Sequence, residues 1–177
     1  MDVAEEVMGN PGLITAIREA LPEEAASLSS LAQESKAHWG YPAEVLAGWR
    51  QELTVTPLDL ARHAAGVAEA GTDIAGFYML CHQDTVCMLE HLWVRPRWMH
   101  QGVGAMLLSH ALLLAHTRHC SPVQVVSDPH AAGFYARLGG IPTGHIPAPL
   151  PGAPDRMLPV YEFALADNGR SHRYGGP

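Results

Sequence analysis

A glycine-rich turn between an apolar run and an amphipathic helix pattern constrains this chain more than any other feature. The stretch runs from Val94 to Leu108 and reads VRPRWMHQGVGAMLL. Gly102 and Gly104 have no Cβ, so the backbone can approach a ligand closely, and the first N–H groups of the following helix lack partners within the helix. Those donors and the positive end of the helix dipole favour phosphate oxygens without any lysine. The stretch therefore predicts a loop that binds phosphate or pyrophosphate.

Spacing excludes two common kinds of glycine loop. The phosphate loop of nucleoside triphosphatases ends in Gly-Lys-Ser/Thr, whereas Gly104 is followed by Ala105 and Met106. A dinucleotide-binding loop needs a third glycine three residues after the second, and this chain has Leu107 there. Neither a triphosphatase nor a dinucleotide-binding protein is therefore expected.

The loop resembles that of the GNAT acyltransferase superfamily, in which Val-x-Pro precedes (Gln/Arg)-x-x-Gly-x-(Gly/Ala). Here Val94-Arg95-Pro96 precedes Met99-His100-Gln101-Gly102-Val103-Gly104. Met99 stands where the family has glutamine or arginine. Because methionine carries no charge and hardly forms hydrogen bonds, phosphate would be held chiefly by backbone N–H groups, unless Arg95 or Arg97 takes that role.

A second motif follows downstream. The segment from Asp128 to Gly140 resembles the family's Asn-x-x-Ala-x-x-Phe-Tyr-x-x-x-Gly-Phe, with Asp128 in place of asparagine and Gly140 in place of the aromatic residue. A helix that only packs Phe134 and Leu138 into a core explains the hydrophobic residues but not the two motifs together. The resemblance covers roughly residues 13 to 165.

The resemblance implies an α/β (α+β) GNAT fold with a mixed, splayed sheet of six to seven strands flanked by about four helices. A chain of 177 residues with 47% hydrophobic content fits one domain, expected over 1–165, with a disordered tail over 166–177. Periodicity and turn residues predict helices from Pro22, around 45–49, after Gly102 and around Phe134. The helix after Gly102 is expected to pack on the sheet through one apolar face made of Val103, Met106, Leu107, Ala111 and Leu114. Strands are expected at 13–18, 64–70, 74–81, 85–94, 123–126, 141–146 and 158–165, with 123–126 parallel to 85–94.

Charge and hydropathy exclude several classes of protein. A formal net charge of −7 argues against a nucleic-acid binder and is compatible with a cationic amine substrate. The longest apolar stretch, 105–115, is interrupted by Ser109 and His110 and is too short to span a membrane. Residues 1–10 carry three acids and no secretory pattern, so a cytoplasmic protein is expected.

The cysteines favour neither a disulfide framework nor a metal centre. Cys81, Cys87 and Cys120 are an odd number, which does not suggest paired bridges. Cys81, Cys87, His82 and His91 include metal-binding side chains, but their spacing matches no zinc module and they fall in segments patterned as strands. No disulfide framework is suggested, and no metal is expected.

The resemblance implies that acetyl-CoA is the co-substrate, lying between the diverging strands 85–94 and 123–126. The main chain of Leu92, Trp93 and Val94 would pair with the pantetheine arm as an added strand. The backbone N–H of Leu92 is the expected donor to the thioester oxygen. The remaining residues implied in cofactor binding are Met99, His100, Gln101, Gly102, Val103, Gly104, Ala105, Asp128 and Tyr135.

Two side chains are candidates for the chemistry. Glu90 lies four residues before Val94, where family members often carry the group that removes the amine proton. Tyr135 matches the family tyrosine that protonates the departing thiolate. A structural glutamate and a core tyrosine are the alternatives. His91 should alternate to the face opposite Glu90 and is less suited as the base, which leaves Asp128 and His130 as further candidates.

The acceptor is the least defined part of the prediction. His38, Trp39 and Tyr41 are candidates for an aromatic and polar wall against a small-molecule or peptide amine, and a packed helix corner is the alternative. The resemblance implies an N-acetyltransferase acting by direct attack on acetyl-CoA in a ternary complex. A non-catalytic acyl-CoA sensor would keep the glycine loop but need neither Glu90 nor Tyr135. Dimerisation is common in such folds, and this sequence leaves it open.

Overall fold

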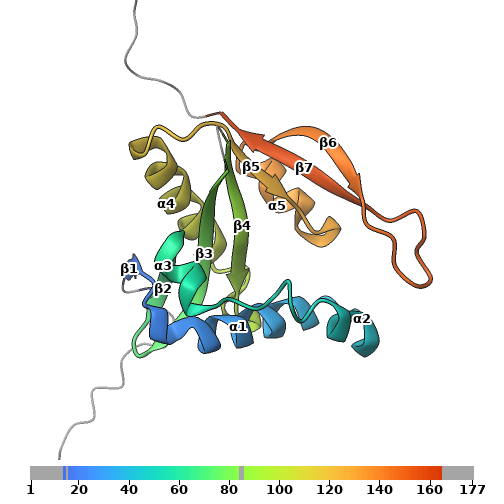
Figure 1. Ribbon diagram of the computed structural model, residues 1–177, viewed down its shortest axis with the longest axis horizontal. Coiled ribbons are helices and arrows are strands. Elements are labelled where there is room, and N and C mark those ends of the chain that lie inside the picture. Colours follow the sequence, from blue (N-terminus) through green and yellow to red (C-terminus); the bar gives the residue numbers. More distant parts are fainter. Residues whose placement is uncertain (1–13, 15, 84–85, 165–177) are drawn as a thin grey trace, which may run out of the picture.

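The computed structural model describes residue 14 and residues 16–83 and 86–164 (Figure 1). The expected tail over 166–177 lies outside these residues, as do parts of the strands expected at 13–18, 85–94 and 158–165. Seven described strands form one mixed sheet in the order β1-β2-β3-β4-β5-β7-β6, with five α-helices around it. The predicted fold class is confirmed. No described helix is long and apolar enough to cross a membrane.

The elements follow the predicted order closely. The strands are β1 (Ala16–Glu19), β2 (Ala64–Ala70), β3 (Asp73–Gln83), β4 (Val86–Val94), β5 (Val123–Val126), β6 (Ile141–Pro147) and β7 (Met157–Phe163). The α-helices are α1 (Ala25–Ala37), α2 (Ala43–Gly48), α3 (Pro57–Arg62), α4 (Val103–Thr117) and α5 (Ala132–Arg137). Short 3₁₀ turns are η1 (Pro22–Glu24), η2 (Pro96–Trp98) and η3 (Pro129–Ala131).

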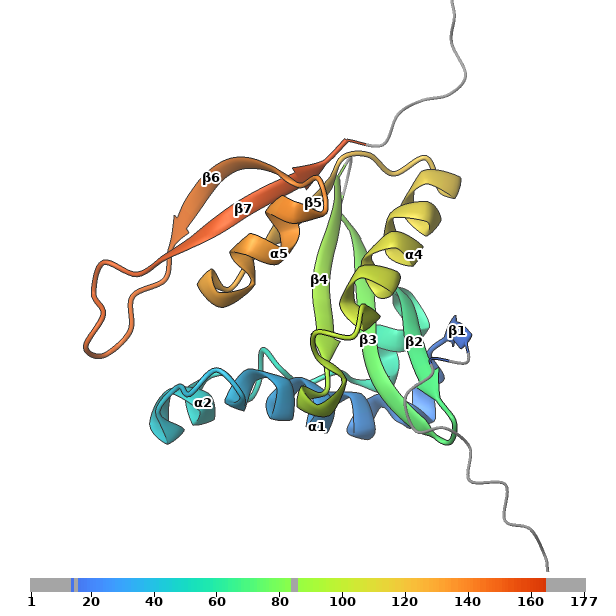
Figure 2. The same cartoon turned by 180° about the vertical axis from the view of Figure 1, so that it is seen from behind.

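The parting of β4 and β5 shapes the middle of the sheet. They pair in parallel, as predicted, but only at Cys87 with Val123 and Met88 with Gln124. Beyond Met88 the two strands diverge, as both ribbon views show (Figures 1 and 2). The edge of β4 that faces β5 therefore offers unpaired backbone groups from Leu89 onward, and such groups need a partner in water or in a ligand.

Helices cover the sheet on both faces, and β3 divides its side chains between two cores. Tyr78 and Leu80 of β3 pack with α4, which lies in front of the sheet when the molecule is seen from behind (Figure 2). Phe77, Met79 and Cys81 alternate to the other face and pack with α1 and the segment that leads to α3. The alternation follows from the two-residue period of a strand.

The buried face of α4 differs slightly from the prediction. Val103, Leu107 and Ala111 are buried as expected, but Met106 is 44% exposed. The helix centres its apolar face on Leu107 and Ala111, so a residue one position before Leu107 is turned toward solvent. The prediction that Met106 packs into the core is therefore wrong.

Helix α3 was not anticipated, although its sequence carries a start signal. Thr56 accepts a hydrogen bond from the Asp59 N–H at 3.1 Å, and the Asp59 carboxylate accepts one from the Thr56 N–H at 2.8 Å. Pro57 occupies the first helical position. This reciprocal arrangement is a capping box, with aspartate in place of the usual glutamate or glutamine.

The odd number of cysteines did not suggest a disulfide framework, but the structure pairs Cys87 with Cys120. Cys87 lies at the start of β4, and Cys120 precedes β5 in the α4–β5 connection, with 5.7 Å between their Cα atoms. That separation suits a disulfide. The odd count leaves Cys81 as a buried free thiol.

Gly76 is the point at which β3 tolerates no side chain. A Cβ there would lie 2.6 Å from the Trp93 carbonyl oxygen and 2.9 Å from Leu107 Cδ1. Because a backbone atom cannot move aside cheaply, we expect Gly76→Ala to lower the free energy of unfolding by about 1–3 kcal/mol. Urea denaturation measures this. Gly48→Ala in α2, where no atom lies within 4 Å of the new Cβ, is the matched control, and equal stability of both variants would contradict the packing argument.

Candidate functional site

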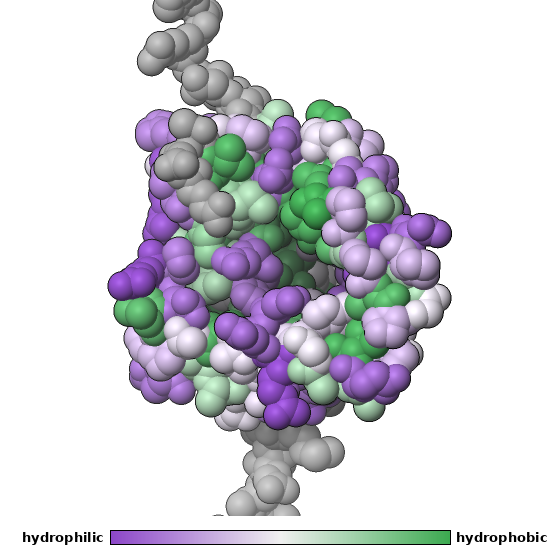
Figure 3. Space-filling view, turned by 45° about the vertical axis from the view of Figure 1, so that its right-hand side comes forward, coloured by the Kyte–Doolittle hydropathy of each residue, from purple (hydrophilic) through white to green (hydrophobic). Residues whose placement is uncertain are grey.

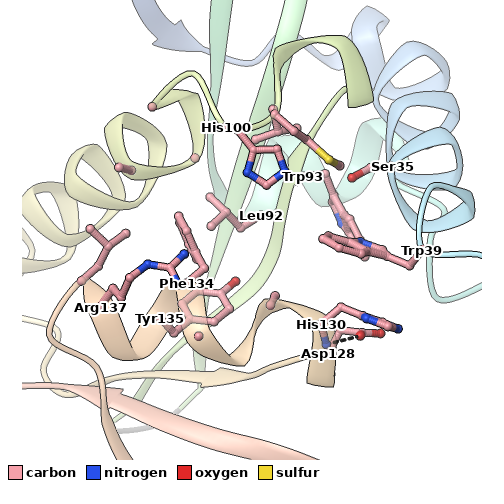
Figure 4. A pocket seen from close by; sticks show the side chains of 18 residues that line it. Ser35, Trp39, Leu92, Trp93, His100, Asp128, His130, Phe134, Tyr135 and Arg137 are labelled. Atoms are coloured by element: carbon pink, nitrogen blue, oxygen red, sulfur yellow. Dashed lines mark hydrogen bonds between the residues drawn. The ribbon is translucent and has the colours of Figure 1, made fainter.

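A cavity of about 520 Å³ opens where β4 and β5 have parted. We call it the large cavity. Its walls come from α1 and the residues after it, the end of β4, the start of α4, and the β5–α5 turn with α5 (Figure 4). The molecule is hollowed on the side that carries α2 and the β6–β7 loop, and hydrophobic residues lie in the hollow's wall (Figure 3). The labelled lining residues are Ser35, Trp39, Leu92, Trp93, His100, Asp128, His130, Phe134, Tyr135 and Arg137.

The glycine loop forms one wall and presents free backbone donors. His100 and Gly102 adopt left-handed conformations, with φ of 61° and 84°. Gly102 is the N-cap of α4 and supplies no side-chain cap, so the N–H groups of residues 103–105 have no partner among the described residues. At Gly104 a Cβ would lie 3.2 Å from the ring of Phe134, so the space between the start of α4 and this ring is narrow. These features suit an anion at the helix N-terminus.

Most residues predicted to bind the cofactor line this cavity, and two do not. Leu92, Trp93 and Val94 contribute from the unpaired edge of β4, and Met99, His100, Gly102, Gly104, Ala105, Asp128 and Tyr135 complete the predicted members. Val103 is instead 1% exposed in the core. The Gln101 side chain donates to the Arg97 carbonyl at 2.7 Å. Any contact of these two residues with a ligand is therefore left to their backbone.

The charge that Met99 lacks is available from a residue not singled out in the sequence. Arg95 is paired with Glu34 and Arg97 with Asp73, so neither is free for phosphate. Arg137, in the last turn of α5, lines the large cavity and makes no ion pair with any described residue. Ser35 was also missed: it is 2% exposed and lines the cavity, and its hydroxyl has no partner in the described part of the chain. Arg137 occupies a helical position typical of a surface residue, and Ser35 occupies one typical of a core residue. Nothing in the sequence therefore marks either of them as a site residue.

Tyr135 lies in the wall formed by α5. Its ring is buried against Phe134, Tyr161 and Phe163, with ring centroids 5.0 to 6.5 Å apart. Its hydroxyl is directed toward the cavity (Figure 4). Burial raises the pKa of the Tyr135 phenol well above its usual value. The group therefore stays protonated and can donate a proton or a hydrogen bond into the cavity.

Glu90 lies in a second cavity, of about 330 Å³, that it shares with His91, Asp59 and Cys81. Met79 and Cys81, which line it, belong to the face of the sheet that packs with α1. The second cavity therefore lies on the face opposite α4. The Cys81 thiol donates to Glu90 Oε2 at 2.6 Å. Burial, together with that hydrogen bond to the carboxylate, raises the pKa of Cys81. Glu90 and Tyr135 are thus near the same strand but not in one cavity.

The expectation that His91 faces away from Glu90 is wrong, because both line the second cavity. Met79 pairs with His91 and Leu80 with Leu89, which leaves Glu90 as an extra, bulged residue of β4. The Trp93 indole N–H donates to His91 Nδ1 at 3.0 Å, so the neutral ring carries its proton on Nε2. Burial lowers the pKa of His91, although the Glu90 charge opposes the shift. With both nitrogens so occupied, His91 cannot accept a proton in this arrangement.

Asp128 joins four parts of the chain at the open end of the parted strands. Lys36 of α1 pairs with Asp128 at 2.5 Å, the Tyr41 hydroxyl donates to it at 2.9 Å, and Arg156 of the β6–β7 loop lies 3.4 Å away. Lys36 Nζ also lies 4.4 Å from the centre of the Trp49 ring. We call Lys36, Tyr41, Asp128 and Arg156 the Asp128 cluster. Asp128 was predicted to bind cofactor, and this cluster occupies its carboxylate with protein partners.

The three residues proposed for the acceptor divide between these environments. Trp39 lines the large cavity and stacks on His130, with ring centroids 5.1 Å apart. Tyr41 belongs to the Asp128 cluster. His38 packs edge-on against Trp39 and does not line either cavity. The packed-corner interpretation therefore describes His38 and Tyr41, and only Trp39 is placed to contact a ligand in the large cavity.

Comparisons with known proteins agree with this architecture. Residues 61–139 match the family model of the acetyltransferase (GNAT) domain. A GCN5-related N-acetyltransferase from Rhodopseudomonas palustris is 22% identical and superposes with a TM-score of 0.70 over 90% of this chain and 98% of its own. The PaiA N-acetyltransferase from Thermoplasma acidophilum, solved in complex with coenzyme A, is 19% identical with a TM-score of 0.69, covering 85% and 98%.

A third structure, the ribosomal-protein-S18-alanine N-acetyltransferase from Escherichia coli, is 14% identical, with a TM-score of 0.66 over 88% of this chain and 97% of its own. A search of curated protein sequences returned no match. The two sequence motifs, the parted sheet and the family match lead to one conclusion. Residues 61–139 match the GNAT acetyltransferase domain, and the described part of the chain has the GNAT fold.

The Asp128 cluster makes stability depend on pH. Burial alone raises the pKa of Asp128, but hydrogen bonds from Lys36, the His130 N–H and Tyr41, with the Lys36 charge, outweigh it and hold this pKa below its usual range. A lowered pKa means that the contribution is present above the unfolded-state value of about 3.9 and is lost as pH falls through the folded value.

We therefore expect Asp128→Asn to lower the free energy of unfolding by about 3 kcal/mol at pH 7, because it leaves the buried Lys36 charge without its partner. The difference from wild type should begin to shrink below about pH 4, where Asp128 of the unfolded chain is protonated, and should be lost only as pH falls through the lowered pKa of the folded protein. Urea unfolding at pH 7 and pH 3 measures both values. Asp155→Asn, on an exposed residue of the β6–β7 loop, is the control. A difference that does not change with pH would show that the ion pair is not the source.

Proposed function

We propose that the protein is an N-acetyltransferase that transfers the acetyl group of acetyl-CoA to a primary amine of a small molecule or peptide, by direct attack in a ternary complex. One observation carries the proposal. The large cavity brings together the unpaired edge of β4, the uncapped N-terminus of α4 and the hydroxyl of a buried tyrosine. These three features match the three parts of an acyl thioester of coenzyme A: an amide-containing arm, a pyrophosphate and a sulfur leaving group.

The residues of the large cavity fit the cofactor by their chemistry. When bound, acetyl-CoA supplies the acetyl group as a thioester. Backbone groups of β4 from Leu92 to Val94 can pair with the amides of its arm, as an added strand would. The free N–H groups at the start of α4 can hold phosphate oxygens, and Arg137 adds a positive charge from the wall formed by α5.

Tyr135 is the proposed proton donor to the leaving thiolate. A phenol whose pKa is raised by burial remains protonated at neutral pH, and a thiolate with an ordinary pKa of about 8.5 is basic enough to accept a hydrogen bond from it. The Leu92 N–H is the proposed donor to the thioester oxygen, where negative charge develops during attack.

The second cavity suits the amine. Glu52, Asp59 and Glu90 place three carboxylates around it, and these attract a cationic ammonium group. An alkylammonium with a pKa of about 10 must lose a proton before it attacks, and Glu90, on the bulge of β4, is the proposed base, directly or through water. The acceptor class we propose is therefore a cationic primary amine. The alternative base His91 is disfavoured by its hydrogen bond from Trp93.

A non-catalytic acyl-CoA sensor remains the second candidate, and one observation favours it. Glu90 and Tyr135 line separate cavities with no lining residue in common among the described residues. A sensor needs only the large cavity. Turnover therefore distinguishes the two functions, whereas binding of acetyl-CoA does not.

Binding is tested by thermal denaturation with and without acetyl-CoA. At one hundred times its dissociation constant the ligand should stabilise the protein by about 2.7 kcal/mol. Gly104→Glu should abolish this effect, because the new side chain meets Phe134 and places a negative charge where phosphate is expected. Gly144→Glu in β6, with no atom within 4 Å of its Cβ, is the matched control and should keep the effect. A wild-type protein that saturating acetyl-CoA does not stabilise would refute the proposed cofactor.

Chemistry is tested by thiol release from acetyl-CoA over a panel of diamines, polyamines, aminoglycosides, amino acids and peptides. Tyr135→Phe should lower kcat roughly 100-fold with little change in acetyl-CoA affinity, because the hydroxyl acts on the leaving group. Glu90→Gln should flatten the acidic limb of the pH–rate profile, because the protonation of its carboxylate no longer limits the rate.

Tyr161→Phe is the matched control for Tyr135→Phe. Tyr161 is also buried, and its ring centroid lies 6.0 Å from that of Tyr135, but it does not line the large cavity. Equal losses in both variants would point to packing rather than proton donation. Unchanged turnover in Tyr135→Phe and Glu90→Gln would exclude both proposed roles, and no turnover with any amine would favour the sensor.

A further inference from the structure

Three metal-binding side chains meet at the closed end of the parted strands, away from both cavities. His82 of β3 and Cys87 of β4 are direct cross-strand partners, and Cys120 comes from the α4–β5 connection. One ligand atom from each residue lies within 4.8 Å of the other two. His82 Nδ1 is 2.9 Å from Cys120 Sγ, and the two sulfurs form the Cys87–Cys120 disulfide.

We propose that His82, Cys87 and Cys120 form a Zn²⁺ site when this disulfide is reduced. A dithiol reductant supplies two electrons and two protons: the Cys87–Cys120 bond breaks, each sulfur takes one proton, and the reductant closes its own disulfide. Binding of Zn²⁺ then displaces both thiol protons to solvent, which leaves two thiolates and a neutral imidazole on the metal. The exchange is balanced and needs no further reactant.

The chemistry of the donors favours zinc. Two thiolates and an imidazole are a common zinc ligand set, and a water can fill the fourth tetrahedral position. Zinc–sulfur bonds of about 2.3 Å put the two sulfurs about 3.8 Å apart, so the metal and the disulfide exclude each other. Both sulfurs are buried, and His82 is exposed, so the imidazole offers an ion a path from solvent.

The position of the site gives it a structural role. The Cys87 N–H donates to the Pro122 carbonyl at 3.2 Å, and Cys87 pairs with Val123 where β4 and β5 are still joined. The disulfide ties β4 to the α4–β5 connection there. A zinc ion held by the same sulfurs would keep that tie under reducing conditions. The closed end of the parted strands would then be fastened in either redox state.

The test uses the full chain in its oxidised and reduced forms. The disulfide is reduced with a phosphine, which is removed by anaerobic desalting before Co²⁺ is titrated as a spectroscopic probe. We expect one equivalent of Co²⁺ to produce a sulfur-to-cobalt charge-transfer band and the intense visible bands of a tetrahedral site, with no such signal from the oxidised form. Zn²⁺ should displace the signal and raise the melting temperature of the reduced form only.

Variants assign the ligands. Cys120→Ser and His82→Ala should each weaken Zn²⁺ binding by roughly 10- to 100-fold or more, since even outer-shell partners contribute that much. Cys81→Ser and His116→Ala are matched controls, because Cys81 lies in the second cavity and His116 is exposed on α4, and both should keep the signal.

Absence of a sulfur-to-cobalt band in the reduced wild type would overturn the proposal, as would a band that survives in the Cys87→Ser/Cys120→Ser double variant. The comparison of oxidised and reduced wild type decides the question even if a variant fails to fold. Neither readout depends on acetyl transfer, so the outcome is independent of the proposed function.

Discussion

The separation of β4 from β5 is the constraint on which the rest of the structure depends. A parallel pair normally continues its hydrogen bonds along both strands, but here pairing stops after two positions. The parting leaves polar backbone groups on the edge of β4 and creates the space for the large cavity. Contacts at both ends of the parted strands stabilise this arrangement. Cys87 and Cys120 tie the closed end, and the Asp128 cluster bridges the open end.

The Asp128 cluster shows how a buried charge can define geometry. Replacing a buried ion pair by apolar residues often leaves the free energy of unfolding unchanged. We therefore assign the cluster a role in positioning the elements that it joins rather than in net stability. Lys36, Asp128 and Arg156 come from α1, the turn after β5 and the β6–β7 loop. Their carboxylate–cation contacts are directional and can form in one arrangement of the two halves of the sheet. The cluster thus joins these three parts of the chain beside the large cavity, which Asp128 also lines.

Strand β4 contributes residues to both the proposed cofactor site and the proposed amine site. Its edge from Leu92 to Val94 faces the large cavity, and the bulge at Glu90 turns that residue and His91 together into the second cavity. A regular strand would place neighbours on opposite faces. The extra residue therefore puts a carboxylate on the proposed amine side without moving the backbone donors that the proposed cofactor needs. Acetyl transfer therefore requires the amine in the second cavity and the acetyl group of the cofactor in the large cavity to meet beside β4.

Local sequence determined what depends on local chemistry. The glycine loop predicted an uncapped helix N-terminus, the turn residues predicted the order of strands and helices, and the two motifs together predicted the family, because backbone conformation and periodicity are set by residues close in the chain. Tertiary structure alone decided the partners of Asp128, the Cys87–Cys120 disulfide, the common orientation of Glu90 and His91, and the place of Arg137 in the cavity wall. Lys36 and Asp128 are 92 positions apart, and a bulge has no signature in the alternation of one strand. Such contacts arise only when distant segments pack, and no pattern within a short stretch records them.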